Sequence, residues 1–215
     1  MPLLELFLSG GVVMWPLLLS SLVVTALILE RGYFWLKIYQ HQDLFIRQVL
    51  ALYGTQPKEA IARLRAHLQF PLARIFLAAL TLEQGTPDDF RLALESAAQA
   101  ELPTLKRFNT LFDTVIGIAP LLGLLGTILG LMRSFAALRI GETTSQSASS
   151  VTAGIGTALI STAAGLIIAI ATLLFANLFI GLYRRQRAAI QSYCGQLELL
   201  YRQYYRQYIA RAPRG

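Results

Sequence analysis

The sequence predicts an all-α fold: a polytopic membrane protein with three transmembrane helices, whose long helices extend into a cytoplasmic helical domain. Charged residues make up only 14% of the 215 residues and hydrophobic residues make up 55%, whereas soluble domains carry roughly 25% charged residues. Three stretches contain no charged residue at all, namely 6–29, 114–132 and 143–183. Each reaches the length of about 20 residues that a spanning helix needs.

The first charge-free stretch resembles a secretory signal peptide in its position and composition. However, no basic residue precedes it and no A-x-A-like cleavage site ends it. It closes on ERGYFWLK (30–37), which combines aromatic residues and cations as membrane interfaces do. We therefore predict an uncleaved membrane helix.

The distribution of positive charge predicts the orientation. Lys and Arg are concentrated in 31–107 and 184–215, and none precedes the first span. Because cytoplasmic loops are enriched in Lys and Arg, these two segments are predicted to be cytoplasmic. The net charge of +7 follows from this topology, and no nucleic-acid partner is predicted. The expected segments are a periplasmic N-terminus (1–10), a first span (11–35), a cytoplasmic domain (36–110), a second span (111–139), a periplasmic hairpin loop (140–150), a third span (151–183) and a basic tail helix (184–215).

The cytoplasmic domain is predicted to consist of helices separated by YGTQP, QFP and QGTP. Pro57 and Pro87 stand where first helical turns would begin, and TPDDF places acidic residues in such a turn. An apolar face is expected on the helix that starts at Pro57, made of Ala60, Ile61, Leu64 and Leu68.

Nothing in the sequence indicates an enzyme, a cofactor or a metal site. His41 and His67 have no further ligand at metal-site spacing, and Cys194 is the single cysteine. No nucleophile–base pair is evident, and GLLGTILG lacks the lysine of a phosphate-binding loop. We interpret the histidines as surface residues and Cys194 as a small packing residue.

The tail helix carries an apolar and aromatic stripe at spacings of three and four. This stripe either forms a coiled-coil seam between subunits or packs on the cytoplasmic helices of the same chain. Its members are Leu197, Leu200, Tyr201, Tyr204 and Tyr208.

The second and third spans are joined by the short polar segment IGETTSQSASS, so they are expected to lie antiparallel and adjacent. Thr127 and Thr162 are about equally far from the middle of this segment and are therefore expected at a similar depth in the membrane. In an assembly of several copies they would form a polar ring. Alternatively, each hydroxyl bonds only a carbonyl of its own helix.

Small residues follow one face of the third span at steps of three and four, which allows close approach of helix backbones in lipid. On the second span, Pro120, Gly123, Gly126 and Gly130 are predicted to serve the same packing. The face on the third span consists of Gly154, Ala158, Ser161, Gly165, Ala169, Thr172 and Ala176.

Two segments carry a family resemblance. APLLGLLGTILGLMRSF (119–135) and GIGTALISTAAGLIIAI (154–170) resemble the paired signature of the ExbB/TolQ family, which also includes relatives of the flagellar stator subunit MotA. The resemblance implies a proton-channel subunit of the bacterial inner membrane. It further implies a homo-oligomer, a pentamer, around a single-span partner of the ExbD or TolR type that carries an intramembrane aspartate, with the lumen lined by the second and third spans.

The resemblance also assigns residues. Thr127 and Thr162 match the motif threonines and would face the partner's carboxylate, with Ser161 beside them in the proton pathway. Many relatives carry a glutamate five residues before the second threonine, where this chain has Thr157, which is also placed in the lumen. Asp113 is the acid nearest the second span, and it is either a proton group on the cytoplasmic side or half of an interfacial ion pair.

The implied activity is the use of the proton motive force to energise TonB-dependent transport across the outer membrane, through a protein of the TonB or TolA type. Protons and membrane lipids would be its small-molecule partners. A TolQ-type role in envelope integrity and a non-conducting membrane scaffold are the alternatives.

Overall fold

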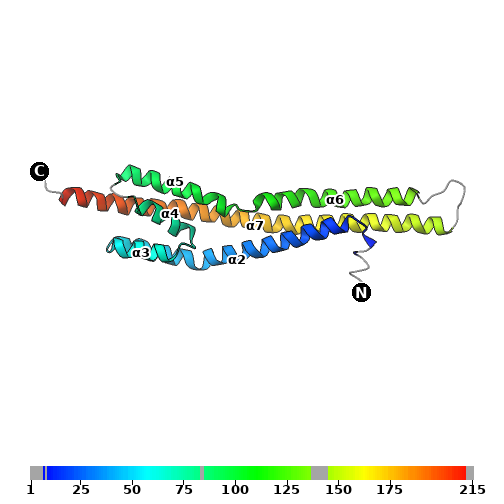
Figure 1. Ribbon diagram of the computed structural model, residues 1–215, viewed down its shortest axis with the longest axis horizontal. Helices are drawn as coiled ribbons and strands as arrows, with labels where there is room; N and C mark the ends of the chain where they lie inside the picture. The colour runs from blue at the N-terminus through cyan, green and yellow to red at the C-terminus, as the bar shows by residue number, and fades with distance from the viewer. Residues whose placement is uncertain (1–6, 8, 83–84, 137–144, 212–215) are drawn as a thin grey trace. The chain divides into compact units, whose positions relative to one another are not determined.

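The computed structural model describes residues 7, 9–82, 85–136 and 145–211, and within these ranges every regular element is an α-helix. Three of the helical stretches are long and apolar enough to cross a membrane: Met14–Tyr53, Pro87–Ala136 and Gly154–Gln207. The predicted fold class, all-α with three transmembrane helices, is confirmed. The helices are α2 (Met14–Tyr53), α3 (Pro57–Ala66), α4 (Pro71–Leu80), α5 (Pro87–Leu105), α6 (Asn109–Ala136) and α7 (Ser145–Arg211) (Figure 1).

The chain divides into two compact units. The first, called here the span unit, comprises Met1–Glu30 and Phe108–Phe179. The second, called here the polar unit, comprises Arg31–Arg107 and Ile180–Gly215. Helices α2 and α7 are each divided between the two units, α2 after Glu30 and α7 after Phe179.

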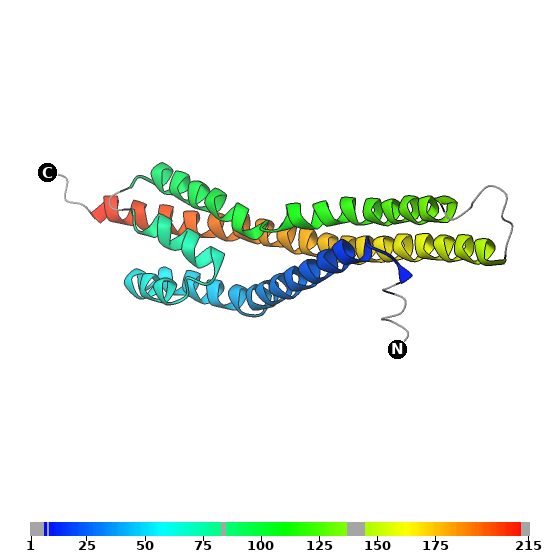
Figure 2. The ribbon, with the colours of Figure 1, turned by 45° about the vertical axis from the view of Figure 1, so that its right-hand side comes forward.

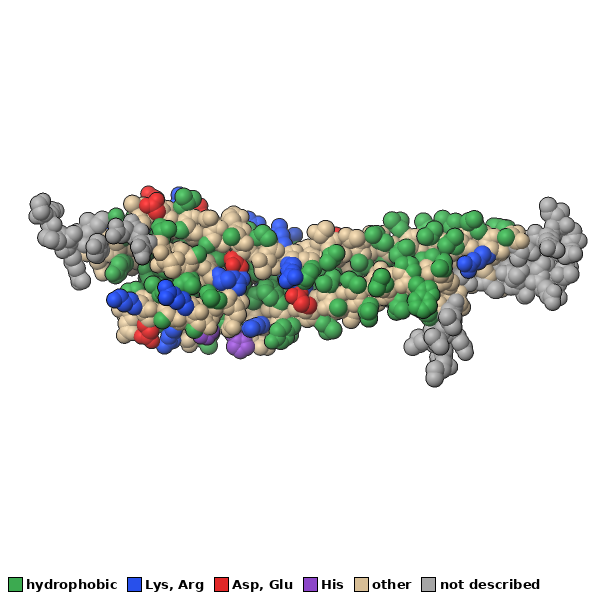
Figure 3. Space-filling view, in the orientation of Figure 1, with side chains coloured by type: hydrophobic (Ala, Val, Ile, Leu, Met, Phe, Trp, Pro, Cys, Tyr) green, Lys and Arg blue, Asp and Glu red, His purple; other side chains and the backbone are tan. Residues whose placement is uncertain are grey.

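In the span unit, α6 lies alongside α7 and the first turns of α2 pack against both (Figures 1 and 2). Their shared core is small and apolar and centres on Val13, Leu17, Ala119 and Ala169. Most other large apolar side chains point outward, and Leu22, Leu121 and Ile167 are 64–68% exposed. Figure 3 shows hydrophobic side chains covering this part of α6 and α7. Such exposure suits lipid or neighbouring subunits, because a soluble surface rarely carries so large an apolar area.

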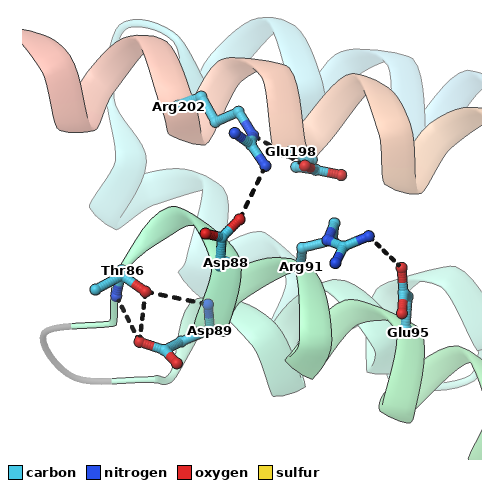
Figure 4. A network of polar contacts seen from close by, with 7 residues as sticks. All are labelled: Thr86, Asp88, Asp89, Arg91, Glu95, Glu198 and Arg202. Atoms are coloured by element: carbon cyan, nitrogen blue, oxygen red, sulfur yellow. Dashed lines mark hydrogen bonds and ion pairs between the residues drawn. The ribbon is translucent and has the colours of Figure 1, made fainter.

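The polar unit is a helical domain, and its helices are separated at the predicted turn segments. Helices α3 and α5 begin at Pro57 and Pro87, as their sequences indicate. Thr86 caps α5: its hydroxyl accepts from the Asp89 N–H, while the Asp89 carboxylate accepts from the Thr86 N–H (Figure 4). The apolar face expected on α3 is buried at Ala60 and Leu64, but Leu68 is 46% exposed. Leu68 departs from that face because α3 ends at Ala66.

Part of the tail stripe packs on helices of its own chain, whereas Tyr204 is 53% exposed. Leu197 is fully buried, and the ring of Tyr201 stacks on Phe90 of α5 at 3.9 Å between centroids. The Tyr201 hydroxyl donates to the carbonyl of Gly85 at 2.7 Å. Beside these contacts, Arg202 pairs with Asp88 and Glu198 at 3.3 and 2.9 Å (Figure 4). Intramolecular packing therefore accounts for Leu197 and Tyr201.

Candidate functional site

The contact between α6 and α7 is made by residues without large side chains. A Cβ added to Gly123 would come 3.0 Å from both the carbonyl oxygen of Ser161 and the Cα of Thr162. A Cβ on Gly126 would overlap the hydroxyl of Ser161 and lie 2.6 Å from its Cβ. Real Cβ atoms essentially never approach as closely as at Gly126, and at Gly123 the backbone of α7 would have to shift by a few tenths of an ångström, so these positions of α6 favour glycine for the observed helix separation.

The same close approach continues toward the hairpin. A Cβ on Gly130 would come 2.8 Å from the carbonyl oxygen of Gly154 and 3.2 Å from the Cβ of Ala158. A Cβ on Gly154 would overlap the hydroxyl of Ser134. On the other side, a Cβ on Gly165 would overlap the carbonyl oxygen of Ala119. Six of the positions predicted to serve packing therefore lie in this contact, namely Gly123, Gly126, Gly130, Gly154, Ala158 and Gly165.

Two further residues belong to the contact and were missed from the sequence. Ala119 is 1% exposed and Ser134 is 2% exposed, and the Ser134 hydroxyl donates to the carbonyl of Gly130 at 3.0 Å. The signal was present, because both residues continue the spacing of three and four that runs through Gly123, Gly126 and Gly130. Pro120, assigned to the contact with them, is only half-buried and lies beside it.

The two threonines donate their hydroxyl protons to backbone carbonyls. Thr162 Oγ1 donates across the helix contact to the carbonyl of Gly123 at 3.2 Å. Thr127 Oγ1 donates within its own helix to the carbonyl of Leu124 at 2.6 Å. A hydroxyl has one proton and two acceptor lone pairs. Each hydroxyl is therefore satisfied as a donor and still able to accept.

The depths of the two threonines differ slightly from the expectation. Because Thr162 pairs with Gly123, four residues from Thr127, the two hydroxyls are offset by about one helical turn, or roughly 6 Å along the axis. The difference arises because the packing pairs Gly123 with Thr162 and Gly130 with Gly154. It does not pair residues that are equally far from position 145.

Both threonines lie on the side of the α6–α7 hairpin that faces away from α2. The residues that pack against Val13 and Leu17 of the core include Leu129 on α6 and Ala164 on α7. At 3.6 residues per turn, Thr127 lies about 160° from Leu129, and Thr162 lies about 160° from Ala164. The hydroxyls thus flank the glycine contact on its outer side, one from each helix.

That outer side is otherwise apolar and exposed within the chain. Thr127 and Thr162 are half-buried, while Leu124, Leu159 and Leu166 around them are 54%, 66% and 46% exposed. The charge-free stretches 114–132 and 143–183 supply no carboxylate at this depth. Among the side chains that the structure describes, this face offers the hydroxyls of Thr127 and Thr162 to a partner or to water, and any acid that carries protons along it must come from elsewhere.

The remaining residues assigned from the sequence are placed as follows. Ser161 is fully buried, and its hydroxyl donates to the carbonyl of Ala158 at 3.0 Å, so it belongs to the helix contact and not to the outer face. Asp113 is exposed near the start of α6. Thr157 lies in α7, but its side chain is outside the described part of the structure.

Comparison with known proteins decides the family. The model of the MotA/TolQ/ExbB proton channel family matches residues 67–192, more than half of the chain and including both threonines. The chain belongs to this family. It is 59% identical over 199 residues to the putative biopolymer transport protein ExbB-like 3 of Synechocystis sp., covering 93% of this chain and 95% of that protein.

Other members of the family are also similar. The putative biopolymer transport protein ExbB-like 1 of Synechocystis sp. is 41% identical over 204 residues, with 94% of this chain and 80% of that protein covered. The biopolymer transport protein ExbB of Salmonella typhimurium is 33% identical over 129 residues, with 56% and 51% covered. The chain is thus a member of a transport and proton-channel family with three apolar helices of membrane-spanning length.

Proposed function

We propose that the chain is the proton-channel subunit of an ExbB-type motor in the bacterial inner membrane. Copies of the chain, five in the arrangement that the family resemblance implies, would surround a single-span partner of the ExbD or TolR type. Proton passage would move this partner and energise TonB-dependent transport across the outer membrane through a TonB-type protein. The relatives named ExbB-like, at 59% and 41% identity, favour this branch over a TolQ-type role. The N-terminus would be periplasmic and the tail cytoplasmic, as the distribution of Lys and Arg favours.

The observation that carries the proposal is the outer face of the α6–α7 hairpin, where Thr127 and Thr162 are polar groups among exposed, apolar and uncharged side chains in the described part of the chain. A carboxylic acid that carries protons through a membrane needs polar partners at its depth. Because both threonine protons are donated to carbonyls, the hydroxyls would act there as acceptors. They would stabilise the protonated acid of the partner more than its ionised carboxylate. They could equally accept a hydrogen bond from a water molecule that donates a proton to this acid.

The test is a Thr→Val series in the chain co-purified with its single-span partner. Valine keeps the shape of threonine and removes the hydroxyl. Reconstituted into liposomes containing a pH dye, the wild-type complex should take up protons under an imposed membrane potential. Thr127→Val and Thr162→Val should each reduce the flux roughly ten-fold, since the loss of one hydrogen bond to a buried group costs about 1–3 kcal/mol.

Thr172→Val is the matched control for this series. Thr172 is also on α7, and its hydroxyl donates to the carbonyl of Ile168 at 2.6 Å, but it is fully buried and therefore does not lie on the exposed outer face. Its flux should stay at the wild-type level. Equal fluxes for wild type, Thr127→Val and Thr162→Val would refute the proposed role of the hydroxyls.

A non-conducting membrane scaffold is the second candidate. It is favoured by the glycine-dependent contact of α6 with α7 and by the backbone bonds that already occupy the protons of Thr127 and Thr162. In that case the wild-type complex itself would take up no protons under an imposed potential.

A further inference from the structure

The polar unit contains a pocket between its parts of α2 and α7 that the proposed function does not use. It has a volume of about 370 Å³, at the lower end of the range of ligand pockets. Residues of both helices line it: Trp35, Ile38, Tyr39, Gln42, Asp43, Leu182, Arg185, Gln186, Ala189 and Tyr193.

Three lining side chains are deeply buried and each carries a polar atom without a hydrogen-bond partner. Trp35, Gln42 and Gln186 are 5%, 3% and 7% exposed. The Gln42 amide donates to Gln186 Oε1 at 3.1 Å. Within the described part of the chain, three buried atoms remain without a hydrogen-bond partner: the indole nitrogen of Trp35, Gln42 Oε1 and the amide nitrogen of Gln186. Buried polar groups nearly always have partners, so this pocket lacks two acceptors and one donor.

The charges around the pocket favour an anion. Arg185 is exposed on its lining, and no ion pair engages it among the residues that the structure describes. The acidic lining residue, Asp43, is already neutralised: Arg47 pairs with it at 3.2 Å, and the Tyr193 hydroxyl donates to it. A negatively charged group would therefore meet a free guanidinium and no free carboxylate.

The position of the pocket in the chain favours a lipid as the source of that anion. Trp35 follows the first charge-free span, and Leu182 belongs to the last residues of the third. The pocket therefore begins where two spans leave the hydrocarbon, which is the level of lipid headgroups. Tyr39 on its lining and the neighbouring Leu36 are 72% and 58% exposed and would border the acyl chains.

We propose that this pocket binds the headgroup of a phosphatidylglycerol-type phospholipid. The phosphate oxygens would accept from the Trp35 indole N–H, the Gln186 amide and Arg185, and a glycerol hydroxyl would donate to Gln42 Oε1. The two acceptors and the donor that the pocket lacks are thus supplied by one headgroup. This site is independent of proton conduction and of the outer face of α6 and α7.

The experiment is native mass spectrometry of the full-length protein, delipidated in mild detergent and then supplied with defined lipids. Phosphatidylglycerol should be retained at one molecule per chain, and phosphatidylcholine, whose headgroup has no hydroxyl, should be retained at least several-fold less. Trp35→Phe removes the N–H and keeps an aromatic ring, and Arg185→Gln removes the charge. Each should lower retention about ten-fold, the effect of losing one strong hydrogen bond.

Arg184→Gln is the matched control, because Arg184 is the exposed neighbour of Arg185 and does not line this pocket. Its lipid retention should equal that of the wild type. In a Trp15→Phe background, which leaves Trp35 as the only tryptophan, the emission of Trp35 should shift when phosphatidylglycerol is added. This second readout reports on the pocket itself, and an unchanged oligomer mass shows that the variants fold.

Three results would overturn the proposal. The first is equal retention of phosphatidylglycerol and phosphatidylcholine. The second is the same loss in Arg184→Gln as in Arg185→Gln. The third is a shift of the Trp35 emission on addition of inorganic phosphate alone, which would assign the pocket to a soluble anion. An emission that no added lipid or phosphate changes in the intact oligomer would count equally against the proposal, because it would indicate that a second copy of the chain covers the pocket.

Discussion

Replacing Gly165 with alanine should force α6 and α7 apart. The added Cβ would overlap the carbonyl oxygen of Ala119 and lie 3.3 Å from the Cα of Gly123. Both obstacles are backbone atoms, so no rotamer change relieves them, and the helices must separate by roughly 1 Å to reach van der Waals distance. Overpacking of this kind costs about 1–3 kcal/mol, and the gain of up to about 1 kcal/mol in helix propensity offsets part of it.

The separation should also break the bond from Thr162 Oγ1 to the Gly123 carbonyl, which is 3.2 Å long at present. Interhelical bonds of this type contribute about 0.6 kcal/mol in membranes. The expected net loss is about 2 kcal/mol in the free energy of unfolding. It is measured by SDS titration of the full-length protein in detergent, followed by circular dichroism.

Two other glycine variants serve as controls. Gly156 lies on the same span and a Cβ there would meet nothing within 4 Å, so Gly156→Ala should be neutral or slightly stabilising. At Gly126 the obstacle is the side chain of Ser161, so the loss in Gly126→Ala should be restored by adding Ser161→Gly. Equal stability of Gly165→Ala and Gly156→Ala would refute the inferred helix contact.

Three further predictions concern the polar unit. Burial raises the pKa of the Cys194 thiol to about 12, so little of it is the reactive thiolate at pH 8. Maleimide should therefore label this partly buried thiol more slowly in the folded protein than after unfolding in SDS, and equal labelling rates would contradict the raised pKa. The hydrogen bonds from the side chain and backbone of Thr86 lower the pKa of Asp89 below its usual 3.8, so this cap should stabilise the fold above pH 4 and lose its effect as the pH falls through the lowered pKa. Thr86→Ala should therefore lower the melting temperature more at pH 7 than near pH 2, where the bond from the Asp89 N–H to the Thr86 hydroxyl is still lost but the ionised carboxylate no longer contributes; equal shifts at both pH values would exclude a contribution from the Asp89 carboxylate. Hydrogen bonding to Glu101 raises the pKa of Arg74, and this partly buried bidentate ion pair has contacts of 2.7 and 2.5 Å. Glu101→Gln should lower the free energy of unfolding in urea by about 1–3 kcal/mol. An unchanged urea midpoint of unfolding would show that the pair contributes nothing to stability.

Much of the fold could be predicted because the relevant signals are local. The absence of charge over about 20 residues identifies a span without knowledge of its neighbours. Pro57 and Pro87 mark helix starts, since proline is tolerated at a first helical position. In the same way, the spacing of Gly123, Gly126 and Gly130 places these residues on one face of a helix.

The rest depends on which residues of different helices meet. The sequence placed Ser161 both on the small-residue face of the third span and beside Thr162 in the proton pathway, and the pairing with Gly126 shows that its side chain is enclosed in the helix contact. Likewise, the stripe at Tyr201 does not reveal its partner, which is Phe90 of α5. The pairing of Gly123 with Thr162, which offsets the two threonines by about one turn, also follows from side-chain packing and not from the length of the hairpin.

In the proposed motor, this chain forms an oligomer around a single-span protein whose acid meets Thr127 and Thr162. The most direct test is native mass spectrometry of the protein extracted in mild detergent from its own host membranes. We expect a ring of this chain that holds a small single-span protein, with an aspartate in that span at the depth of the two threonines. A reproducible homo-oligomer without such a protein, or a partner without an intramembrane acid, would contradict this proposal.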